Sequence, residues 1–209
     1  MKLDPYNKKR NFSKTSEPKG NRSTSSTKNL FVIHKHAARN LHYDFRLELN
    51  GVLLSWSVPK GPCFDPKVKR LAIQTEDHPI EYGAFEGIIP KGEYGGGTVM
   101  LWDKGKWLSD DDINPTKSYH KGHLRFTLKG KKLKGHWSLI KLKASDDKAW
   151  LLIKSADEFA KPLDKYDVTL EEPNSAVSKL SIQAISEKHV KVWTKSGAQK
   201  ATSKKKQND

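Results

Sequence analysis

The sequence predicts a mainly β protein of short antiparallel strands, with few short helices and flexible polar termini. From Phe31 to Ile153, apolar residues occur in short alternating runs that Gly, Pro and Asn interrupt, which is typical of strands. Sustained 3.6-residue periodicity is scarce in this region. About seven strand-like runs favour a barrel or a sandwich. The 209-residue chain has room for one such domain with tails.

The N-terminal segment is polar. Residues 1–29 include Lys8-Lys9-Arg10 and the Ser/Thr-rich run from Ser23 to Thr27. A segment of this composition has too few apolar side chains to build a core of its own. We therefore expect residues 1–29 to form a basic polar arm that precedes the domain.

The clearest unit is a β-hairpin from Leu41 to Val58. Its first strand carries Leu41, Tyr43, Phe45, Leu47 and Leu49 on one face, and His42, Asp44, Arg46 and Glu48 on the other. Asn50-Gly51 predicts a type I′ turn, which joins two antiparallel strands tightly. The expected return strand runs from Val52 to Val58 and ends before Pro59.

Further strands are expected along the rest of the domain. They are Leu71 to Thr75, Thr98 to Trp102, Leu124 to Leu128, Trp137 to Leu142 and Trp150 to Ile153. After Ala160 the apolar density falls, and the chain ends in a basic segment that includes Lys204-Lys205-Lys206. We therefore expect the domain at residues 30–160 and a mostly flexible basic tail at residues 161–209, with a short strand or helix possible from Leu180 to Ile185.

The charge balance indicates a polyanionic partner. The chain has 39 Lys+Arg against 24 Asp+Glu, a net charge of +15, which favours nucleic acid through counterion release. A membrane partner is disfavoured, because no stretch approaches the roughly 20 apolar residues that span a bilayer. The N-terminus lacks the apolar run of a signal peptide, and the lone Cys63 cannot form an intrachain disulfide. A cytoplasmic, nucleoid-associated setting is therefore expected.

The polar face of the hairpin is a candidate metal site. His42, Asp44 and Arg46 project from one face with neighbours roughly 7 Å apart along the strand. His36 lies six residues before His42, and a loop could fold its imidazole back toward them. Two imidazoles and a carboxylate suit Mn, Fe or Zn, and Arg46 could grip a phosphate beside the ion. On spacing alone, this face could equally be the solvated side of an amphipathic strand.

A second polar cluster runs from Glu76-Asp77-His78-Pro79 to Tyr82-Gly83. It follows an expected strand, where loops commonly place catalytic groups. His78 could be a metal ligand, a general acid or a hydrogen-bond donor to phosphate, or simply a surface histidine beside a proline. The run Gly92-Glu93-Tyr94-Gly95-Gly96-Gly97 favours a tight turn or bulge over a phosphate cradle, because no helix follows it.

Four motifs together resemble one known family. They are Lys35-His36-(x)4-Leu41-His42-Tyr43-Asp44-Phe45-Arg46-Leu47-Glu48, Trp56-Ser57-Val58-Pro59-Lys60-Gly61-Pro62, Glu76-Asp77-His78-Pro79, and Gly92-x-Tyr94-Gly95-Gly96-Gly97. They closely resemble the 3′-phosphoesterase domain of bacterial ligase D. The resemblance covers roughly residues 6–160, because Arg10-Asn11-Phe12, Thr15-x-Glu17-Pro18 and Trp150-Leu151-Leu152-Ile153-Lys154 also fit it.

This resemblance implies a compact β-barrel enzyme that uses manganese or a similar divalent metal. Such an enzyme removes a 3′-terminal ribonucleoside and then the 3′-phosphate, leaving a 3′-hydroxyl for end joining. By motif, the implied metal ligands are His36, His42 and Asp44, and the implied phosphate contacts are Arg46 and His78. Glu76, Tyr82, Lys60 and Arg70 would support the pocket, while Arg10 and Glu17 match positions associated with the ribonuclease step. Asn11 stands where the family usually has an aspartate.

Two other classes of function fit part of the pattern. His42 and Asp44, together with a distant histidine, also match the ligand triad of a non-haem iron oxygenase. A non-catalytic basic nucleic-acid-binding module would make the histidines incidental. No Lys-x-Asp-Gly motif is present, so we expect a stand-alone, monomeric enzyme. It would act on DNA or RNA-terminated 3′ ends, with a ligase, a polymerase or a Ku-type protein in trans.

Overall fold

A computed structural model describes residues 2–21, 29–110, 114–143 and 147–187. In these ranges the strands are β1 (Leu30–Ala37), β2 (Leu41–Leu49), β3 (Val52–Val58), β4 (Lys69–Gln74), β5 (Gly87–Ile89), β6 (Gly97–Ser109), β7 (His123–Gly130), β8 (Lys134–Lys141) and β9 (Ala149–Lys154). The helices are α1 (Asp4–Lys8), α2 (Pro115–His120), α3 (Val168–Glu171) and α4 (Ile182–Glu187), with a 3₁₀ segment, η1, at Ile80–Ala84. The predicted mainly β fold is confirmed.

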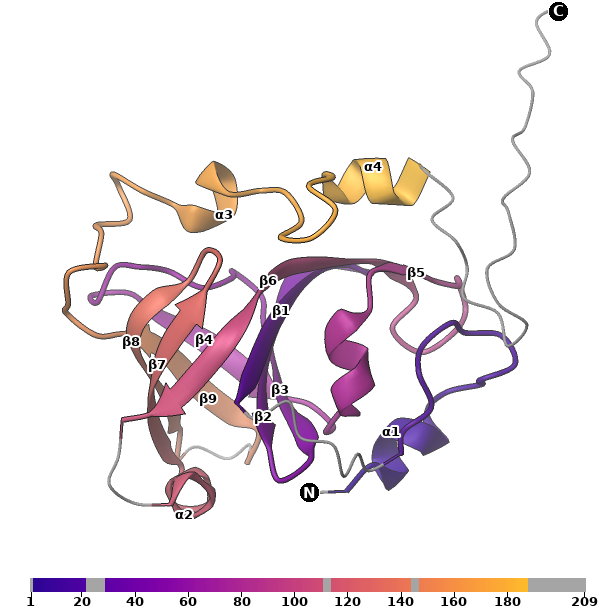
Figure 1. Ribbon diagram of the computed structural model, residues 1–209, viewed down its shortest axis with the longest axis horizontal. Helices are drawn as coiled ribbons and strands as arrows, with labels where there is room; N and C mark the ends of the chain where they lie inside the picture. The colour runs from indigo at the N-terminus through magenta and orange to yellow at the C-terminus, as the bar shows by residue number, and fades with distance from the viewer. Residues whose placement is uncertain (1, 22–28, 111–113, 144–146, 188–209) are drawn as a thin grey trace, which may run out of the picture.

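The strands form a closed antiparallel barrel (Figure 1). Their order is β1-β2-β3-β4-β9-β8-β7-β6, and β6 pairs again with β1 to close the ring, while β5 adds to β6 outside it. Closure leaves the eight ring strands without a free edge. Of the two predicted architectures, the structure is therefore the barrel.

The predicted hairpin is confirmed, with its register. β2 and β3 pair from Tyr43 opposite Val58 to Leu49 opposite Val52. Asn50 and Gly51 have φ values of 52° and 79°, which is the double positive φ that a type I′ turn requires. This register fixes which side chains of β2 and β3 lie beside one another at the site.

The barrel interior holds the main core. Its largest fully buried side chains are aromatic and include Trp56, Trp102, Trp137, Trp150 and Phe45. Trp56 and Trp150 pack edge to face, with ring centroids 5.7 Å apart. Aromatic side chains bury much apolar area at little entropic cost, so this core gives the site a rigid support.

A second core lies on the outer side of β1 and β3, beneath the N-terminal arm and η1. Tyr6 of α1 is fully buried there and packs with Val32, Leu53, Ile80 and Tyr82. Because this layer covers most of the outer face, three of the four polar side chains of β2 are not on a solvated surface, and the fourth, His42, is half-buried. Asp44, Arg46 and Glu48 are all buried. The alternative interpretation of this face as solvated is therefore wrong.

The strand assignments also differ in places. β1 and β5 were not among the predicted strands, and β6 continues well beyond the predicted Trp102. β1 lacks a simple alternation because most of its residues are buried on both faces, and its register with β6 shifts between Ile33 and His34. The register shift lies just before the last part of β1, which contains His36.

The segment after the barrel is structured in its described part, although a mostly flexible tail was expected from residue 161. Trp102 Nε1 donates a hydrogen bond to the Glu172 carbonyl (2.7 Å), and the Ala176 amide donates to the Leu101 carbonyl (2.9 Å). Ile185 of α4 is fully buried in the main core, and α4 overlaps the expected short helix. The runs Ser23 to Thr27 and Lys204-Lys205-Lys206 lie outside the described residues. Among the described residues, no helix is long and apolar enough to cross a bilayer.

Candidate active site

Three side chains that can bind a metal converge at one end of the β1–β2 hairpin. His36 of β1 lies directly opposite His42 of β2, and Asp44 follows two residues later on the same outer face. One donor atom from each of the three lies within 4.8 Å of the others. The short turn at residues 38–40 folds the chain back and brings His36 toward His42, as expected, and His36 itself lies on a strand. Strand pairing therefore fixes the distance between the two imidazoles.

Backbone carbonyls orient the two histidines. His36 Nε2 donates to the Gly95 carbonyl (2.8 Å), and His42 Nδ1 donates to the Asn40 carbonyl (2.9 Å), because a carbonyl can only accept. His36 Nδ1 then lies 3.7 Å from Asp44 Oδ2, and His42 Nε2 lies 3.5 Å from Asp44 Oδ1. Each imidazole therefore turns its remaining nitrogen toward the carboxylate, which is the arrangement expected of metal-binding histidines.

The glycine run forms a turn, as the sequence predicts, and this turn holds His36. Gly95 has φ 74° and supplies the carbonyl that His36 binds. Gly97 has φ 149°, and a Cβ there would lie 2.2 Å from the Ala37 carbonyl oxygen. Only glycine can occupy that position without a clash, since the two backbones approach so closely. The glycine run therefore orients His36 and does not form a phosphate cradle.

Arg46 is buried beside the three candidate ligands. Its Nη2 donates to Asp44 Oδ2 (3.1 Å), its Nη1 to Ser55 Oγ (2.7 Å) and its Nε to His34 Nδ1 (3.3 Å). Burial alone would raise the pKa of Asp44, but Arg46 and the neighbouring histidines outweigh it and hold this pKa well below its usual range. Asp44 is therefore an ionised carboxylate that is ready to bind a cation.

His78 lies between two guanidinium groups. Its Nδ1 is 2.8 Å from Arg46 Nη1, and its Nε2 is 3.2 Å from Arg10 Nη2. Burial, Arg46 and Arg10 together hold the pKa of His78 well below 6.5, so the imidazole is neutral near pH 7. Its Nδ1 also lies 2.9 Å from the Glu76 carbonyl, so Nδ1 carries the proton and Nε2 accepts from Arg10. The two guanidinium groups on either side of this neutral ring make a site that suits an anion with several oxygens.

The N-terminal arm delivers Arg10 to this site. Arg10 Nε donates to Glu17 Oε1 (2.7 Å) and Nη1 donates to Glu76 Oε1 (3.2 Å), while its guanidinium lies 3.7 Å from the centroid of the Tyr6 ring. Thr15 Oγ1 donates to the second oxygen of Glu17 (2.8 Å). The arm therefore contributes a positioned cation, and Glu17 holds it from behind.

These groups surround a cavity of about 310 Å³. Its lining includes eight residues singled out from the sequence: Arg10, His36, His42, Asp44, Arg46, Glu76, His78 and Tyr82. Lys60 and Arg70 do not line it: Lys60 is exposed in the turn after β3, and Arg70 lies on β4. The structure therefore brings together most of the predicted site, but not these two cations.

Sequence reasoning gave no role to four residues that contact the site, although one of them, Tyr94, stands in a family motif. His34 and Ser55 hold Arg46, Tyr6 packs against Arg10 and His78, and Tyr94 lies at the cavity rim, where its hydroxyl is 3.2 Å from Lys9 Nζ. The hairpin register carried a signal for Ser55, since it lies directly opposite Arg46. A strand through Leu30–Ala37 would have placed His34 on the face of His36. Tyr6 had no such signal.

Comparison with known proteins agrees with this geometry. Residues 34–141 match the family described as the DNA ligase D 3′-phosphoesterase domain. The chain is 48% identical over 183 residues, 86% of its length, to the multifunctional non-homologous end joining protein LigD of Pseudomonas aeruginosa. It is 43% identical over 164 residues, 75% of its length, to the LigD protein of Mycolicibacterium smegmatis. A third relative is the LigD DNA repair protein of Mycobacterium tuberculosis, 44% identical over 141 residues, 67% of the chain.

The chain spans about a fifth of the length of these relatives, at 22%, 21% and 18% respectively. The matched region, residues 34–141, contains the three candidate ligands together with Arg46 and His78. Because this family match covers more than half of the sequence and includes the centre of the cavity, the chain belongs to the DNA ligase D 3′-phosphoesterase domain family.

Proposed function

We propose that this protein is a metal-dependent phosphoesterase that processes the 3′ ends of nucleic acids in DNA repair. It removes a 3′-terminal ribonucleoside and a 3′-phosphate, leaving a 3′-hydroxyl that a ligase can join. One observation carries this proposal: the donor atoms of His36, His42 and Asp44 cluster within 4.8 Å, directly beside the buried Arg46. A metal-binding group and a phosphate-binding group thus share one cavity.

The donor set fits a divalent transition metal. His36 would bind through Nδ1 and His42 through Nε2, since the other nitrogen of each ring donates to a carbonyl. Two imidazole nitrogens and a carboxylate suit Mn²⁺ or a similar ion better than Mg²⁺ or Ca²⁺, which prefer oxygen ligands. When bound, such an ion supplies Lewis-acid polarisation of the phosphoryl group.

Arg46 and Arg10 supply fixed positive charge for the phosphate. Arg46 is held by Ser55 and Asp44, and Arg10 by Glu17 and Glu76, so neither side chain has to reorganise when an anion binds. Donors that are already aimed at developing negative charge lower the barrier to reaction. We assign Arg46 to binding the scissile phosphate. We assign Arg10 to binding the terminal nucleoside as it enters the cavity.

His78 acts in its neutral form in this proposal. The sequence alone suggested His78 as a general acid, but burial and the two guanidinium groups hold its pKa well below 6.5. Its Nδ1 lies 2.9 Å from the Glu76 carbonyl, which can only accept, so Nδ1 carries the proton and Nε2 accepts from Arg10 Nη2 (3.2 Å). We therefore assign His78 the positioning of Arg10 beside the phosphoryl group. Tyr82 packs against the His78 ring, with ring centroids 4.8 Å apart, and fixes its plane. Glu76 forms an ion pair with Arg10 and helps to hold it in place.

The names of the relatives suggest partners. Since they are called non-homologous end joining proteins, we propose that this chain prepares ends for the same process. A ligase, a polymerase or a Ku-type protein would act on those ends with it, and we expect the protein to work as a monomer. The net charge of +15 supports a nucleic-acid substrate.

One assay tests the proposal. A labelled duplex that ends in either a 3′-phosphate or a 3′-ribonucleotide is incubated with the protein in EDTA, and again after addition of Mn²⁺, Zn²⁺ or Mg²⁺. We expect conversion to a 3′-hydroxyl with Mn²⁺, little with Mg²⁺ and none in EDTA. His42→Ala removes one of the ligands and should abolish turnover.

His123→Ala is the matched control, because His123 is exposed on β7 and does not line the cavity. This variant should retain wild-type turnover. Full activity of His42→Ala, or full activity of the wild type under strong chelation, would contradict the assignment. Oxygen consumption with 2-oxoglutarate and iron would indicate the oxygenase class instead.

A further inference from the structure

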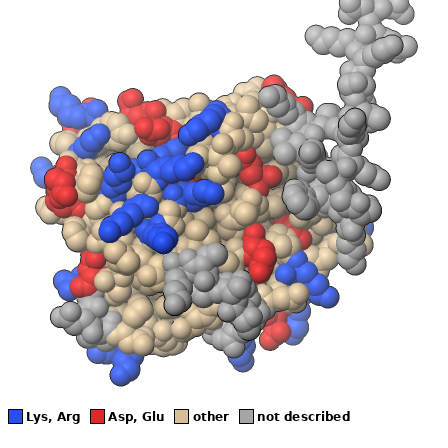
Figure 2. Space-filling model, viewed as in Figure 1, with Lys and Arg blue, Asp and Glu red and all other residues tan. Residues whose placement is uncertain are grey.

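A row of lysines crosses the outside of the barrel, away from the cavity. Lys106 of β6 lies directly opposite Lys129 of β7, which in turn lies opposite Lys134 of β8. Lys104 is two residues before Lys106 and shares its outward face, and all four side chains are exposed. Figure 2 shows that Lys and Arg side chains gather over this face. We call these four residues the lysine row.

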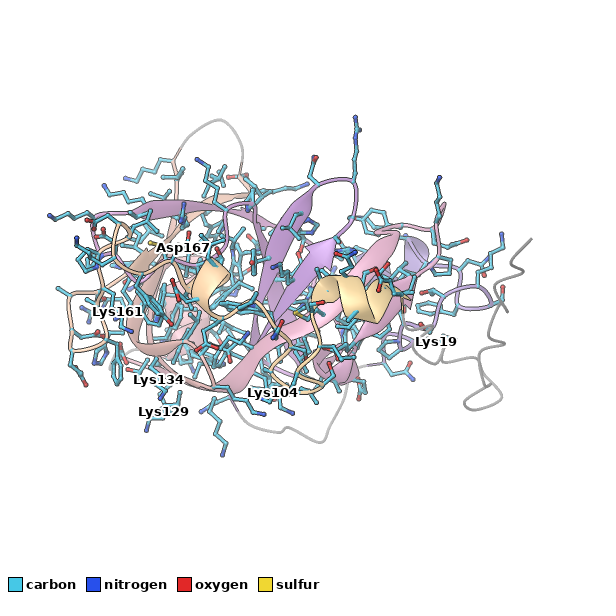
Figure 3. The ribbon with its side chains drawn as sticks, turned by 90° about the horizontal axis from the view of Figure 1, so that it is seen from above. Lys19, Lys104, Lys129, Lys134, Lys161 and Asp167 are labelled. Carbon is cyan, nitrogen blue, oxygen red and sulfur yellow. The ribbon has the colours of Figure 1, made fainter. Side chains whose placement is uncertain are left out.

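The views place the lysine row on one side of the molecule. Seen from above, Lys104, Lys129 and Lys134 lie along the same edge of the barrel and point outward, whereas Lys19 lies at the opposite end (Figure 3). Their backbones share a sheet, so the spacing is fixed: roughly 5 Å between neighbouring strands and roughly 7 Å between alternate residues of one strand. The row is therefore a rigid grid of positive charge.

The lysine row has no ion-pair partner in the described part of the protein. None of the four lysines forms an ion pair with a carboxylate of the described residues. A cavity of about 430 Å³ beside Lys129 and Lys134 is lined by one acidic residue, Glu158, which is not paired with either. Like charges directly opposite each other on a sheet repel and destabilise it. An anionic partner would relieve that repulsion.

Strand register relates the row to the cavity. Lys104 lies opposite Val32 on β1, and Val32 lies opposite Arg46 on β2, so Lys104 and Arg46 are only two strands apart. At the other end of β6, Val99 lies opposite His36. Counting from Val99 along β6, Lys104 and Lys106 are roughly 15–25 Å from the candidate ligands. The row is thus near enough for one ligand to reach both places.

A nucleic-acid duplex has the right charge and length for this. It carries a phosphate about every 3.4 Å along each strand, so a distance of 15–25 Å corresponds to about five to seven nucleotides from an end. A short acidic peptide could cover the row but would have no reason to lie at this distance from the cavity. A membrane would contact the row without any relation to the cavity. The geometry therefore favours a duplex whose 3′ end lies in the cavity.

We propose that Lys104, Lys106, Lys129 and Lys134 bind the sugar-phosphate backbone of the duplex, about five to seven nucleotides from the 3′ end under processing. This inference rests on the proposed function, since it names the substrate of the same cavity. It makes the enzyme selective for ends on duplexes long enough to reach the row. Phosphate contacts of this kind position a substrate without reading its sequence.

The test compares two triple variants of equal charge. Lys106→Glu/Lys129→Glu/Lys134→Glu removes most of the lysine row, whereas Lys67→Glu/Lys69→Glu/Lys121→Glu changes three exposed lysines outside the row. Both are assayed on a 3′-phosphorylated duplex of about 20 base pairs and on a dinucleotide 3′-phosphate that is too short to reach the row. Duplex binding is measured by fluorescence anisotropy at several salt concentrations.

We expect the row variant to raise KM for the long duplex tenfold or more and to leave kcat/KM for the dinucleotide unchanged. For the row variant, the logarithm of the duplex association constant should fall less steeply with the logarithm of salt concentration, with a slope smaller by about 2 to 3. Each lost phosphate contact removes about 0.9 from this slope. The control variant should change both quantities much less. Lys129→Gln alone should weaken duplex binding while leaving the melting temperature equal or higher, since it removes repulsion from Lys106 and Lys134.

Three results would overturn the inference. Equal weakening by the two triple variants would show that only net charge matters. Equal loss on the dinucleotide would place the effect in the cavity. Unchanged duplex affinity with lost binding to vesicles of anionic phospholipid would assign the row to a membrane. If the wild type processes no 3′ end at all, the proposed function fails, but the anisotropy measurement still decides whether the row binds duplex.

Discussion

Arg46 Nη1 lies 2.8 Å from His78 Nδ1, and the opposite nitrogen of the same guanidinium, Nη2, lies 3.1 Å from Asp44 Oδ2. One buried side chain therefore joins a candidate metal ligand to the neutral His78 imidazole. Ser55, directly across the hairpin, holds the same group from β3. Because four side chains, with His34 as the fourth, contact this guanidinium, a change at position 46 should affect metal affinity, substrate binding and stability together.

Arg46→Ala should lower kcat/KM for a 3′-phosphate by about 10² or more, since it removes a preorganised donor to the phosphoryl group. It should also destabilise the metal-free protein by about 3–5 kcal/mol, because Asp44 is left buried without its cation. Steady-state kinetics and urea denaturation measure the two effects.

Arg46→Lys is the informative companion to that variant. It keeps the charge but loses the planar fork that contacts Asp44, Ser55 and His34 at once. We expect it to stay well below wild-type activity. If the lysine variant had wild-type kinetics, the geometry of the guanidinium would not matter and the role given to Arg46 would have to be reduced to charge alone.

The metal-free protein should lose stability as the pH falls below about 6.5. Burial and two guanidiniums hold the pKa of His78 well below 6.5 in the folded state, whereas the unfolded chain binds the proton near 6.5. The unfolded state is therefore favoured by about 1.4 kcal/mol per pH unit below that value, until the folded pKa is reached. Denaturation between pH 7.5 and 4.5 measures this slope.

His78→Gln should make the slope shallower, because glutamine does not titrate. Other histidines contribute to both proteins, so the relevant quantity is the difference between the two curves. That difference should be constant above pH 7 and should shrink steadily below pH 6.5. Parallel curves over the whole range would show that His78 binds its proton equally well in both states.

Tyr6 should anchor the N-terminal arm. Tyr6→Ala removes a fully buried ring beneath Arg10 and should cost about 3–5 kcal/mol of unfolding free energy, with loss of activity because Arg10 is no longer held. Tyr6→Phe removes only the hydrogen bond from the hydroxyl to the Pro18 carbonyl (2.7 Å) and should cost about 1 kcal/mol. Similar losses for both variants would show that the hydroxyl, and not the ring, secures the arm.

Asn11→Asp should raise ribonucleoside removal and leave 3′-phosphate removal unchanged. Asn11 is exposed beside Arg10, and its Oδ1 accepts from the Ser13 amide (3.1 Å) and hydroxyl (2.6 Å), which an aspartate can also do. The substitution therefore adds a carboxylate without disturbing the turn. Paired assays on duplexes with a 3′-ribonucleotide or a 3′-phosphate measure the ratio, and a ratio equal to that of the wild type would exclude this position from the nuclease step.

Local sequence patterns predicted the parts of the fold that local physics determines. Strict alternation and Asn50-Gly51 gave the β2–β3 hairpin with its register, because an apolar face and a turn type together specify a strand pair. β1 was missed because its residues are buried on both sides, which removes the alternation. The packing of α4 on the barrel depends on tertiary contacts that no local pattern records.

The same distinction applies to the candidate site: local sequence patterns predicted one part of it, and contacts between distant segments determine the other. His36, His42 and Asp44 could be singled out because short spacing on paired strands brings them together. That the polar face of β2 is buried could not be foreseen, since Tyr6 and Tyr82 cover it from segments distant in sequence. Lys60 and Arg70 were included by motif alone, and a motif does not show in which direction a side chain points.

The folded arm has a thermodynamic consequence for substrate recognition. Residues 2–21 already lie in place, with Arg10 clamped between Glu17 and Glu76. Ordering a free segment costs about 1–2 kcal/mol of backbone entropy per residue, and here that cost belongs to folding of the protein. A calorimetric titration should therefore show only a small negative heat-capacity change on binding, unlike recognition segments that fold on their target. The binding free energy then reflects the contacts in the cavity, with little offset for ordering the arm. The free energy lost with a single contact should therefore appear almost in full in the measured binding constant.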